Sequence, residues 1–224
     1  MKRFDILSLF PEYFQGPFDV SMIKRARESG LLDIGLVQMR DFAEGRYQQI
    51  DDRPYGGGPG MVLMAQPVAG AIRSVKKPFS HVVYLTPQGN PLTAQRCKEL
   101  AEFDHLIILC GHYEGIDERV IESEVDEEIS IGDFVLTSGA PAAIVLVDAV
   151  SRFIPGVIGN EEATRQDSFE NGKFDAPVYT RPPIFEGREV PEVLKTGHHK
   201  EIADWREKKA DEKTFRVRPD LLRR

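Results

Sequence analysis

The sequence predicts an α/β fold built on a mainly parallel sheet, followed by a small α-helical C-terminal domain. Two observations lead to this prediction. Short apolar runs alternate with helical patterns over residues 1–159, which is typical of a parallel sheet covered by helices on both faces. After residue 159 the alternation stops, and a polar, proline-punctuated segment leads into an amphipathic helix.

The elements follow from the apolar patterns and their boundary residues. Ser21 and Thr93 stand where N-caps are expected, because their hydroxyls can accept a hydrogen bond from the first turn. The predicted strands are 3–9, 31–38, 81–86, 105–110 and 127–131. The predicted helices of the first domain are 21–29, 66–76, 93–102, 117–124 and 140–154.

The chain is expected to divide into two domains. Residues 160–172 are polar without periodicity and are interpreted as a linker between residues 1–159 and 173–224. Within the second domain we expect a helix at 199–209 and a short one at 219–223.

Composition places the chain among soluble globular proteins. Of its 224 residues, 41% are hydrophobic and 29% are charged, which argues against disorder. No apolar run approaches the roughly 20 residues that cross a bilayer. The first 14 residues are interpreted as a strand and not as a signal peptide. We expect Cys97 and Cys110 to be buried free thiols in a reducing cytoplasm.

The net charge of −7 argues at face value against a nucleic-acid partner, but the charge is unevenly distributed. Residues 1–159 account for all of it, whereas residues 195–224 carry ten basic and six acidic side chains. A solvated helix face and an RNA-facing patch both explain this segment. The same choice, helix packing or RNA contact, applies to Trp205 and Arg206.

The stretch RPYGGGPGM (53–61) holds four glycines and two prolines. A phosphate-binding P-loop is excluded because neither lysine nor a hydroxyl residue follows Gly60, and a dinucleotide fingerprint fails because Pro59 lacks an N–H donor. A flexible linker is unlikely to be followed directly by the apolar MVLM. The remaining hypothesis is a shaped loop that lets the main chain approach a planar group or another subunit.

Three irregular segments leave predicted strands: YLTPQG (84–89), CGHYEGIDER (110–119) and SIGDFVLTSGAPA (130–142). Ligands of open parallel sheets bind beyond the carboxyl ends of the strands, so the three segments predict one small-molecule pocket. The five histidines have no metal-ligand spacing, and no serine or cysteine stands in a nucleophile-elbow pattern.

Taken together in this order, DDRPYGGGPGM, YLTPQG, GHYEGIDER, SIGDFVLTSG, SRFIPGVIG, DSF and YTRP resemble the bacterial tRNA (guanine-N1)-methyltransferase family. That family belongs to the SPOUT class and modifies guanosine 37 beside the anticodon. The resemblance implies that three strand-end loops form a deep trefoil knot that binds S-adenosylmethionine in a bent shape. It further implies a cytoplasmic homodimer, with no membrane association, in which each pocket is completed by the partner chain. Periodicity alone does not predict a knot.

The resemblance also implies a set of site residues. Those that would bind the methyl donor are Tyr84, Leu85, Thr86, Pro87, Gly111, Tyr113, Glu114, Ile131, Gly132, Asp133, Phe134, Val135, Leu136, Ser138 and Gly139. Those that would contact tRNA are Gly57, Gly58, Pro59, Arg165, Ser168, His198 and Arg206. No metal ligand is implied, and a magnesium ion is assigned to no residue.

The catalytic pair that the resemblance implies is Asp167 and Arg152. Guanine N1 carries a proton at neutral pH, and its removal moves negative charge onto O6. A carboxylate near N1 serves as general base, while a guanidinium near O6 stabilises the developing charge. A base that closes over the site only when RNA binds would provide induced-fit selectivity.

Structural roles compete with these functional ones. Asp167 could cap a helix, and Arg152 could interact with a helix dipole. Glu114 and Asp117 could form a surface ion pair with Arg119, and Tyr113 could belong to the core.

One departure from the family pattern bears on function. Ser138 and Ala140 stand where relatives usually have glycine and glutamate. This departure makes a non-catalytic RNA-binding homologue one alternative, against which the presence of Arg152 and Asp167 argues. The other alternative is a SPOUT methyltransferase that acts on another RNA.

Overall fold

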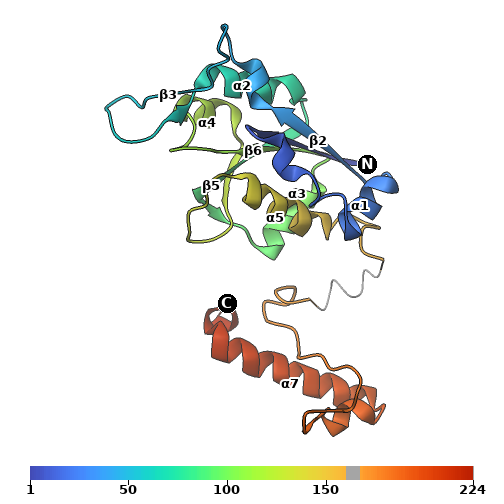
Figure 1. Ribbon diagram of the computed structural model, residues 1–224. Coiled ribbons are helices and arrows are strands. Elements are labelled where there is room, and N and C mark those ends of the chain that lie inside the picture. The colour runs from blue at the N-terminus through green and yellow to red at the C-terminus, as the bar shows by residue number, and fades with distance from the viewer. Residues whose placement is uncertain (160–166, 224) are drawn as a thin grey trace. The chain divides into compact units, whose positions relative to one another are not determined.

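The computed structural model describes residues 1–159 and 167–223. Two compact units are formed, Met1–Gly159 and Asn160–Arg224, and each is described by itself (Figure 1). Among the described residues, no helix has both the length and the apolar character needed to cross a bilayer.

The first unit is built on a five-stranded sheet in the order β2-β1-β6-β5-β7, with every neighbouring pair parallel. This confirms the predicted α/β class with a parallel sheet. The strands are β1 (Lys2–Ser8), β2 (Leu32–Gln38), β5 (Ser80–Pro91), β6 (His105–Cys110) and β7 (Glu127–Ser130). The pair β3 (Asp51–Asp52) and β4 (Val62–Leu63) forms a separate antiparallel ladder.

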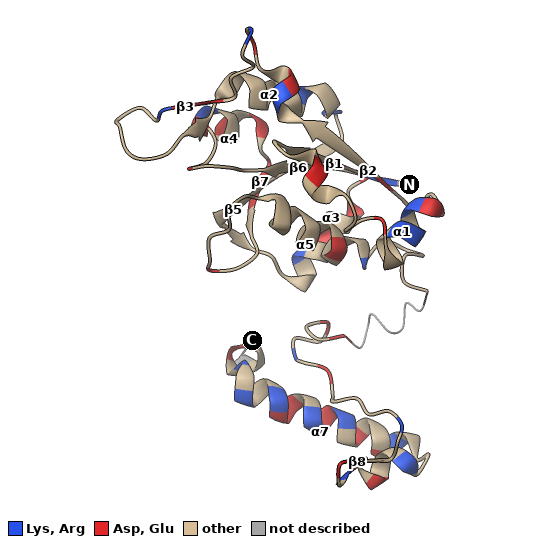
Figure 2. Ribbon diagram, in the orientation of Figure 1, with Lys and Arg blue, Asp and Glu red and all other residues tan. Residues whose placement is uncertain are grey.

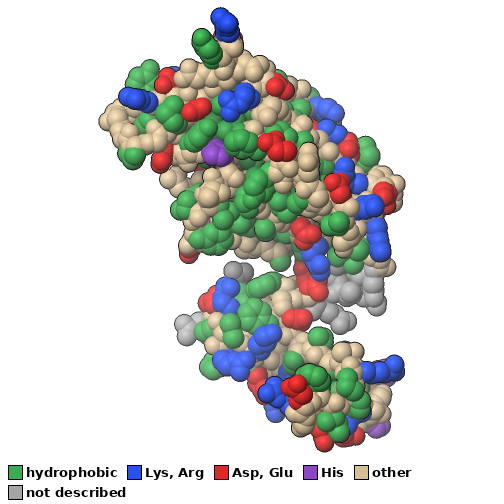
Figure 3. All heavy atoms as spheres, in the orientation of Figure 1, with side chains coloured by type: hydrophobic (Ala, Val, Ile, Leu, Met, Phe, Trp, Pro, Cys, Tyr) green, Lys and Arg blue, Asp and Glu red, His purple; other side chains and the backbone are tan. Residues whose placement is uncertain are grey.

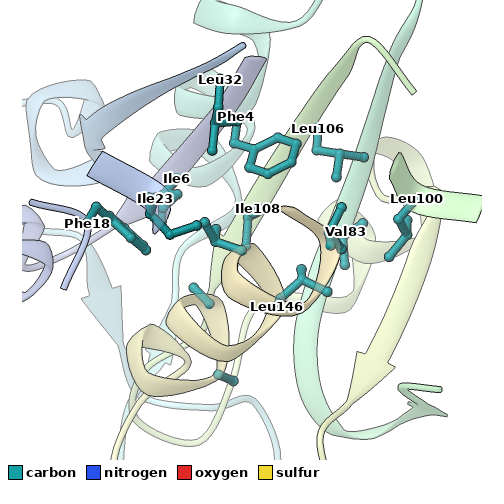
Figure 4. Packing of buried hydrophobic residues seen from close by; sticks show 14 of the residues in the cluster. Phe4, Ile6, Phe18, Ile23, Leu32, Val83, Leu100, Leu106, Ile108 and Leu146 are labelled. Carbon is teal, nitrogen blue, oxygen red and sulfur yellow. The ribbon is translucent and has the colours of Figure 1, made fainter. Parts of the chain in front are cut away.

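Helices cover both faces of the sheet, and the central strand β6 is buried along its whole length. Leu106 and Ile108 point into a cluster with α1, α3 and α5, whereas Ile107 and Leu109 point into a second cluster with α2 and α4. Figure 4 shows the first cluster, with Leu146 of α5 facing the sheet. Continuous burial explains why this strand appears in the sequence as an unbroken apolar run.

The helices of the first unit lie close to the predicted ranges. Thr93 caps its helix as predicted, because its Oγ1 accepts a hydrogen bond from the Arg96 N–H. The prediction for Ser21 was wrong: it is the first helical residue, Val20 is the cap, and no side-chain cap bond forms. The helices are α1 (Ser21–Glu28), α2 (Ala65–Val75), α3 (Ala94–Glu102), α4 (Glu118–Glu124) and α5 (Ala140–Ser151), with 3₁₀ turns η1 (Pro11–Phe14) and η2 (Met39–Phe42).

Both cysteines are buried free thiols, as predicted. Burial raises the pKa of the Cys97 thiol to about 11, and burial also raises the pKa of Cys110. Both side chains pack in the cluster that contains α5. Their role in the fold is therefore that of small apolar residues.

The second unit contains a helix much longer than predicted. The expected range was 199–209, whereas α7 spans His199–Val217. Among the described residues of α7, only Ala210 and Thr214 are buried. The helix therefore has no continuous apolar stripe from which its length could be predicted. The remaining elements are β8 (Ile184–Phe185), β9 (Arg188–Glu189), η3 (Glu192–Lys195) and η4 (Pro219–Arg223).

Basic and acidic residues alternate along α7, as the ribbon colours in Figure 2 show. Lys173 contacts both Glu207 and Asp211, at 3.3 and 2.8 Å. Lys209 pairs with Glu212 at 2.6 Å within the helix. Part of the basic charge of the C-terminal segment is therefore offset locally.

Glu124 at the end of α4 provides a test of the packing between α2 and α4. Its buried carboxylate accepts hydrogen bonds from Arg73 at 2.7 Å and Lys76 at 3.2 Å. Burial opposes ionisation, but these bonds outweigh it and hold the pKa of Glu124 below its ordinary value of 4.5. The stabilisation is therefore present above about pH 4.5 and is lost as the pH falls through the folded-state pKa.

We expect Glu124→Gln to lower the free energy of unfolding at pH 7 by roughly 1–2 kcal/mol, because two charge-assisted hydrogen bonds become neutral. The difference from the unmodified protein should shrink at pH values where Glu124 is protonated. Urea unfolding at pH 7 and pH 3 measures both effects. Glu122→Gln, an exposed change on the same helix, is the control. A difference that persists unchanged at pH 3 would contradict the assignment.

Candidate functional site

The site begins where β5 departs from regular pairing. The predicted strand ended at residue 86, but β5 continues to Pro91 with an interruption: Leu85 and Asn90 both pair with Ile129 of β7. The intervening residues 86–89 therefore bulge away from the sheet. A Cβ at Gly89 would overlap the main chain of Glu128 and Ile129, so the return of the bulge to the sheet requires glycine.

The loops after β6 and β7 are joined main chain to main chain. The Gly139 N–H donates to the Gly111 carbonyl oxygen at 2.8 Å, and His112 forms an antiparallel bridge with Ser138. A Cβ at Gly139 would lie 2.9 Å from both the Cys110 Cα and the Gly111 nitrogen. No side chain fits in this contact, so the two loops meet only because residue 139 is glycine.

The glycine-rich loop ends against the loop that follows β6. The Glu114 N–H donates to the Met61 carbonyl oxygen, and the Leu63 N–H donates to the Gly115 carbonyl oxygen, both at 3.0 Å. A Cβ at Gly60 would collide with the Glu114 side chain. The segment 53–61 is thus attached to a wall of the site at its C-terminal end.

Tyr84 forms the floor beneath these loops. Its side chain is buried, and a Cβ at Gly111 would lie 3.0 Å from its ring. Burial raises the pKa of the Tyr84 phenol, and the negative charges of Glu128 and Glu118 act in the same direction. The hydroxyl therefore remains protonated at neutral pH.

The three loops enclose a cleft of about 330 Å³, which falls within the roughly 300–1,000 Å³ of small-molecule sites. It lies at the bulge of β5 and at the carboxyl ends of β6 and β7, the edge at which parallel sheets bind ligands. All the residues predicted to bind a methyl donor line it, except Asp133. Sequence reasoning did not name the other lining residues, which are Gln88, His112, Gly115, Ile116, Glu118, Ile121, Glu128, Ile129, Ser130, Thr137 and Ala142.

Two structural alternatives are settled within this region. Tyr113 is 46% exposed and has a φ of +58°, so the alternative that placed it in the core is wrong. Arg119 and Asp117 form the expected ion pair at 2.8 Å, and the Asp117 carboxylate also caps α4 by accepting a hydrogen bond from the Arg119 N–H.

The glycines of the 53–61 loop satisfy a backbone requirement. Gly56, Gly57 and Gly58 have φ values of +85°, +78° and +119°, a region that L-residues rarely adopt. No atom lies within 4 Å of a Cβ built at any of the three. Within the described residues of this chain the loop is therefore open on its glycine side, and Pro59 beside it is also exposed.

The two residues predicted to catalyse belong to different units. Arg152 is exposed and is the C-cap of α5. Its charge therefore lies at the negative end of the helix dipole, as the structural alternative for this residue expected. Asp167 opens a turn in which the Glu170 N–H donates to its carbonyl oxygen at 3.2 Å. No helix begins there, so the helix-cap alternative was wrong.

The remaining residues predicted to contact RNA belong to the second unit. Ser168 and Asp175 share a hydrogen bond of 2.5 Å. His198 is the N-cap of α7 and Arg206 lies within that helix, and both side chains are exposed. The ring of Trp205, next to Arg206, lies 6.2 Å from the ring of Tyr179 between centroids. Arg165 lies outside the described residues.

The first unit is thus an α/β fold with a cleft at the carboxyl edge of a parallel sheet. Residues 1–224 match the family model described as tRNA (Guanine-1)-methyltransferase TrmD. The chain belongs to the tRNA (guanine-1)-methyltransferase family.

Similar proteins carry the same description. A tRNA (guanine-N(1)-)-methyltransferase of Protochlamydia amoebophila is 62% identical over 218 residues, which cover 97% of this chain and 98% of the relative. Relatives of that name from Chlamydia pneumoniae and Chlamydia trachomatis serovar D are 60% and 55% identical, over 98% and 97% of this chain. The chain spans only 60% and 61% of those two proteins.

The Gly139 contact can be tested by adding one methyl group. We expect Gly139→Ala to destabilise the first unit by about 1–3 kcal/mol, because the new Cβ would press on the main chain of residues 110 and 111. Gly159→Ala is the matched control, since a Cβ there meets nothing within 4 Å. Thermal unfolding measures the difference, and equal effects of the two variants would contradict the contact.

Proposed function

We propose that this chain transfers the methyl group of S-adenosylmethionine to N1 of guanosine 37 in tRNA. Membership of the family carries the proposal, and the cleft beyond β5, β6 and β7 supports it. Bound there, S-adenosylmethionine would supply an electrophilic methyl group on a sulfonium. Leu85 and Ile131 offer apolar surface to a nucleoside, while the glycine main chain allows close approach.

Two side chains of this protein would make guanine N1 nucleophilic. The Asp167 carboxylate would accept the proton from guanine N1, and the Arg152 guanidinium would stabilise the negative charge that moves to O6. The cleft would hold donor and acceptor in line, since a displacement at carbon depends mainly on positioning. We further propose that the three loops form the trefoil knot of the SPOUT class.

A cytoplasmic homodimer would bring the two catalytic residues together from different chains. Phe10, Tyr13 and Val145 are large hydrophobic residues that are 41%, 49% and 46% exposed. The elements η1 and α5 that carry Tyr13 and Val145 pack together. Figure 3 shows hydrophobic side chains gathered on a face of the first unit. An exposed apolar patch of this kind favours contact with a second copy.

Residues 160–172 would then act as the linker, and 173–224 as the tRNA-binding part. The exposed His198 and Arg206 support this role, because basic side chains contact phosphates. Ser168, in the turn after Asp167, would help to position the base.

Methyl transfer to a tRNA transcript with guanosine at position 37 tests the proposal. We expect product with guanosine 37 and none with adenosine 37. Asp167→Asn and Arg152→Gln should each lower kcat by about 100-fold or more, without changing the affinity for S-adenosylmethionine. Donor binding without methylation of either transcript, but with methylation of ribosomal RNA, would support the alternative substrate.

The glycine loop is proposed to lie against the guanine and the partner subunit. Gly57→Val should abolish methyl transfer and leave donor affinity largely unchanged, because a β-branched residue cannot keep a φ of +78°. Gly45→Val is the matched control, with a φ of +82° and equally open surroundings. Equal loss of activity and donor affinity in Gly57→Val would count against this role.

A further inference from the structure

The cleft is lined by three carboxylates, and no lysine or arginine lines it within residues 1–159. The carboxylates belong to Glu114, Glu118 and Glu128, which come from the loop after β6, the start of α4 and β7. None of them forms an ion pair with a residue in the described part of the chain. Figure 2 shows acidic residues on α4.

The acidic residues next to two of the cleft carboxylates do form ion pairs. Asp117, next to Glu118 in the sequence, pairs with Arg119 at 2.8 Å. Glu127, next to Glu128, is held by Arg96 at 2.5 Å. Asp117 and Glu127 are thus neutralised by arginines, whereas the carboxylates of Glu118 and Glu128 have no such partner among the described residues.

The charges of these carboxylates act on Tyr84, which forms the floor of the cleft. Glu128 stands opposite Tyr84 in the register of β5 and β7. The charges of Glu128 and Glu118 both act on the Tyr84 phenol and, after burial, contribute to the rise of its pKa. Two carboxylates from different elements therefore act on one interior point, and an unpaired negative field in a partly enclosed site favours a positive ligand.

We infer that Glu118 and Glu128 make the cleft selective for a cationic ligand, so that the methyl donor binds more tightly than the demethylated product. The inference rests on the proposed function. S-adenosylmethionine carries a sulfonium, whereas S-adenosylhomocysteine has the same skeleton with a neutral thioether. The carboxylates would hold the first and favour release of the second after each transfer.

Calorimetry on the full chain with three ligands tests this inference. The ligands are S-adenosylmethionine, S-adenosylhomocysteine and sinefungin, in which a protonated amine replaces the methylsulfonium. Both cationic ligands should bind at least about threefold more tightly than the thioether. The preference should fall in 0.5 M salt, because partly exposed charges are screened.

The variants Glu118→Gln and Glu128→Gln should each reduce the preference by about half or more, while the affinity for S-adenosylhomocysteine stays the same. Glu122→Gln, on the exposed side of α4, should leave all three affinities unchanged.

Two results would overturn different parts of the argument. If none of the three ligands binds the unmodified chain, the proposed function fails. If all three bind, but with a preference that neither salt nor the two glutamine variants reduce, the electrostatic inference fails and the proposed function stands. The salt series uses the unmodified chain, so the test remains decisive even if a variant does not fold.

Discussion

The close contact between the main chains of Gly139 and residues 110–111 is the constraint on which the site depends. One hydrogen bond of 2.8 Å joins the loops after β6 and β7, and no Cβ fits between them. With a larger residue at 139, α5 would begin farther from β6 and the cleft would lose one wall. The arrangement of the cleft is therefore decided by the absence of a side chain.

The same principle recurs around the cleft. Gly89 lets the β5 bulge return against Glu128 and Ile129, and Gly60 lies where any side chain would meet Glu114. Tyr84 fills the space beneath Gly111. The sheet supplies a rigid edge, glycines let the loops approach one another, and one buried aromatic ring supports them. Unpaired carboxylates then give the resulting space its charge.

Much of the fold could be predicted from the sequence, because its signals are local. The apolar run of β6 and the hydroxyl of Thr93 each indicate their role through neighbouring residues. The continuation of β5 to Pro91 could not be predicted, since the bulge depends on pairing with β7, a distant segment. The length of α7 was also missed, because small residues such as Ala210 leave a weak apolar pattern.

The site, too, could be predicted where its signals are local and not where they depend on distant segments. Loops that leave parallel strands could be expected to converge, and the resemblance supplied the residues within them. Glu118 and Glu128 were missed because they stand inside a helix and a strand, where an acidic residue usually indicates a solvated face. Only the register that places Glu128 opposite Tyr84 reveals where its charge acts. Asp167 and Arg152 remain a prediction that rests on the resemblance.

The backbone character of the cleft wall has a consequence for inhibition. A compound that packs against the peptide groups of residues 111 and 139, which are bonded to each other, would contact atoms that every amino acid carries. Escape by exchanging a side chain is then difficult, since bulk at residue 139 disturbs the wall itself. Medicinal chemistry directed at those peptide groups would accordingly face a high genetic barrier to resistance.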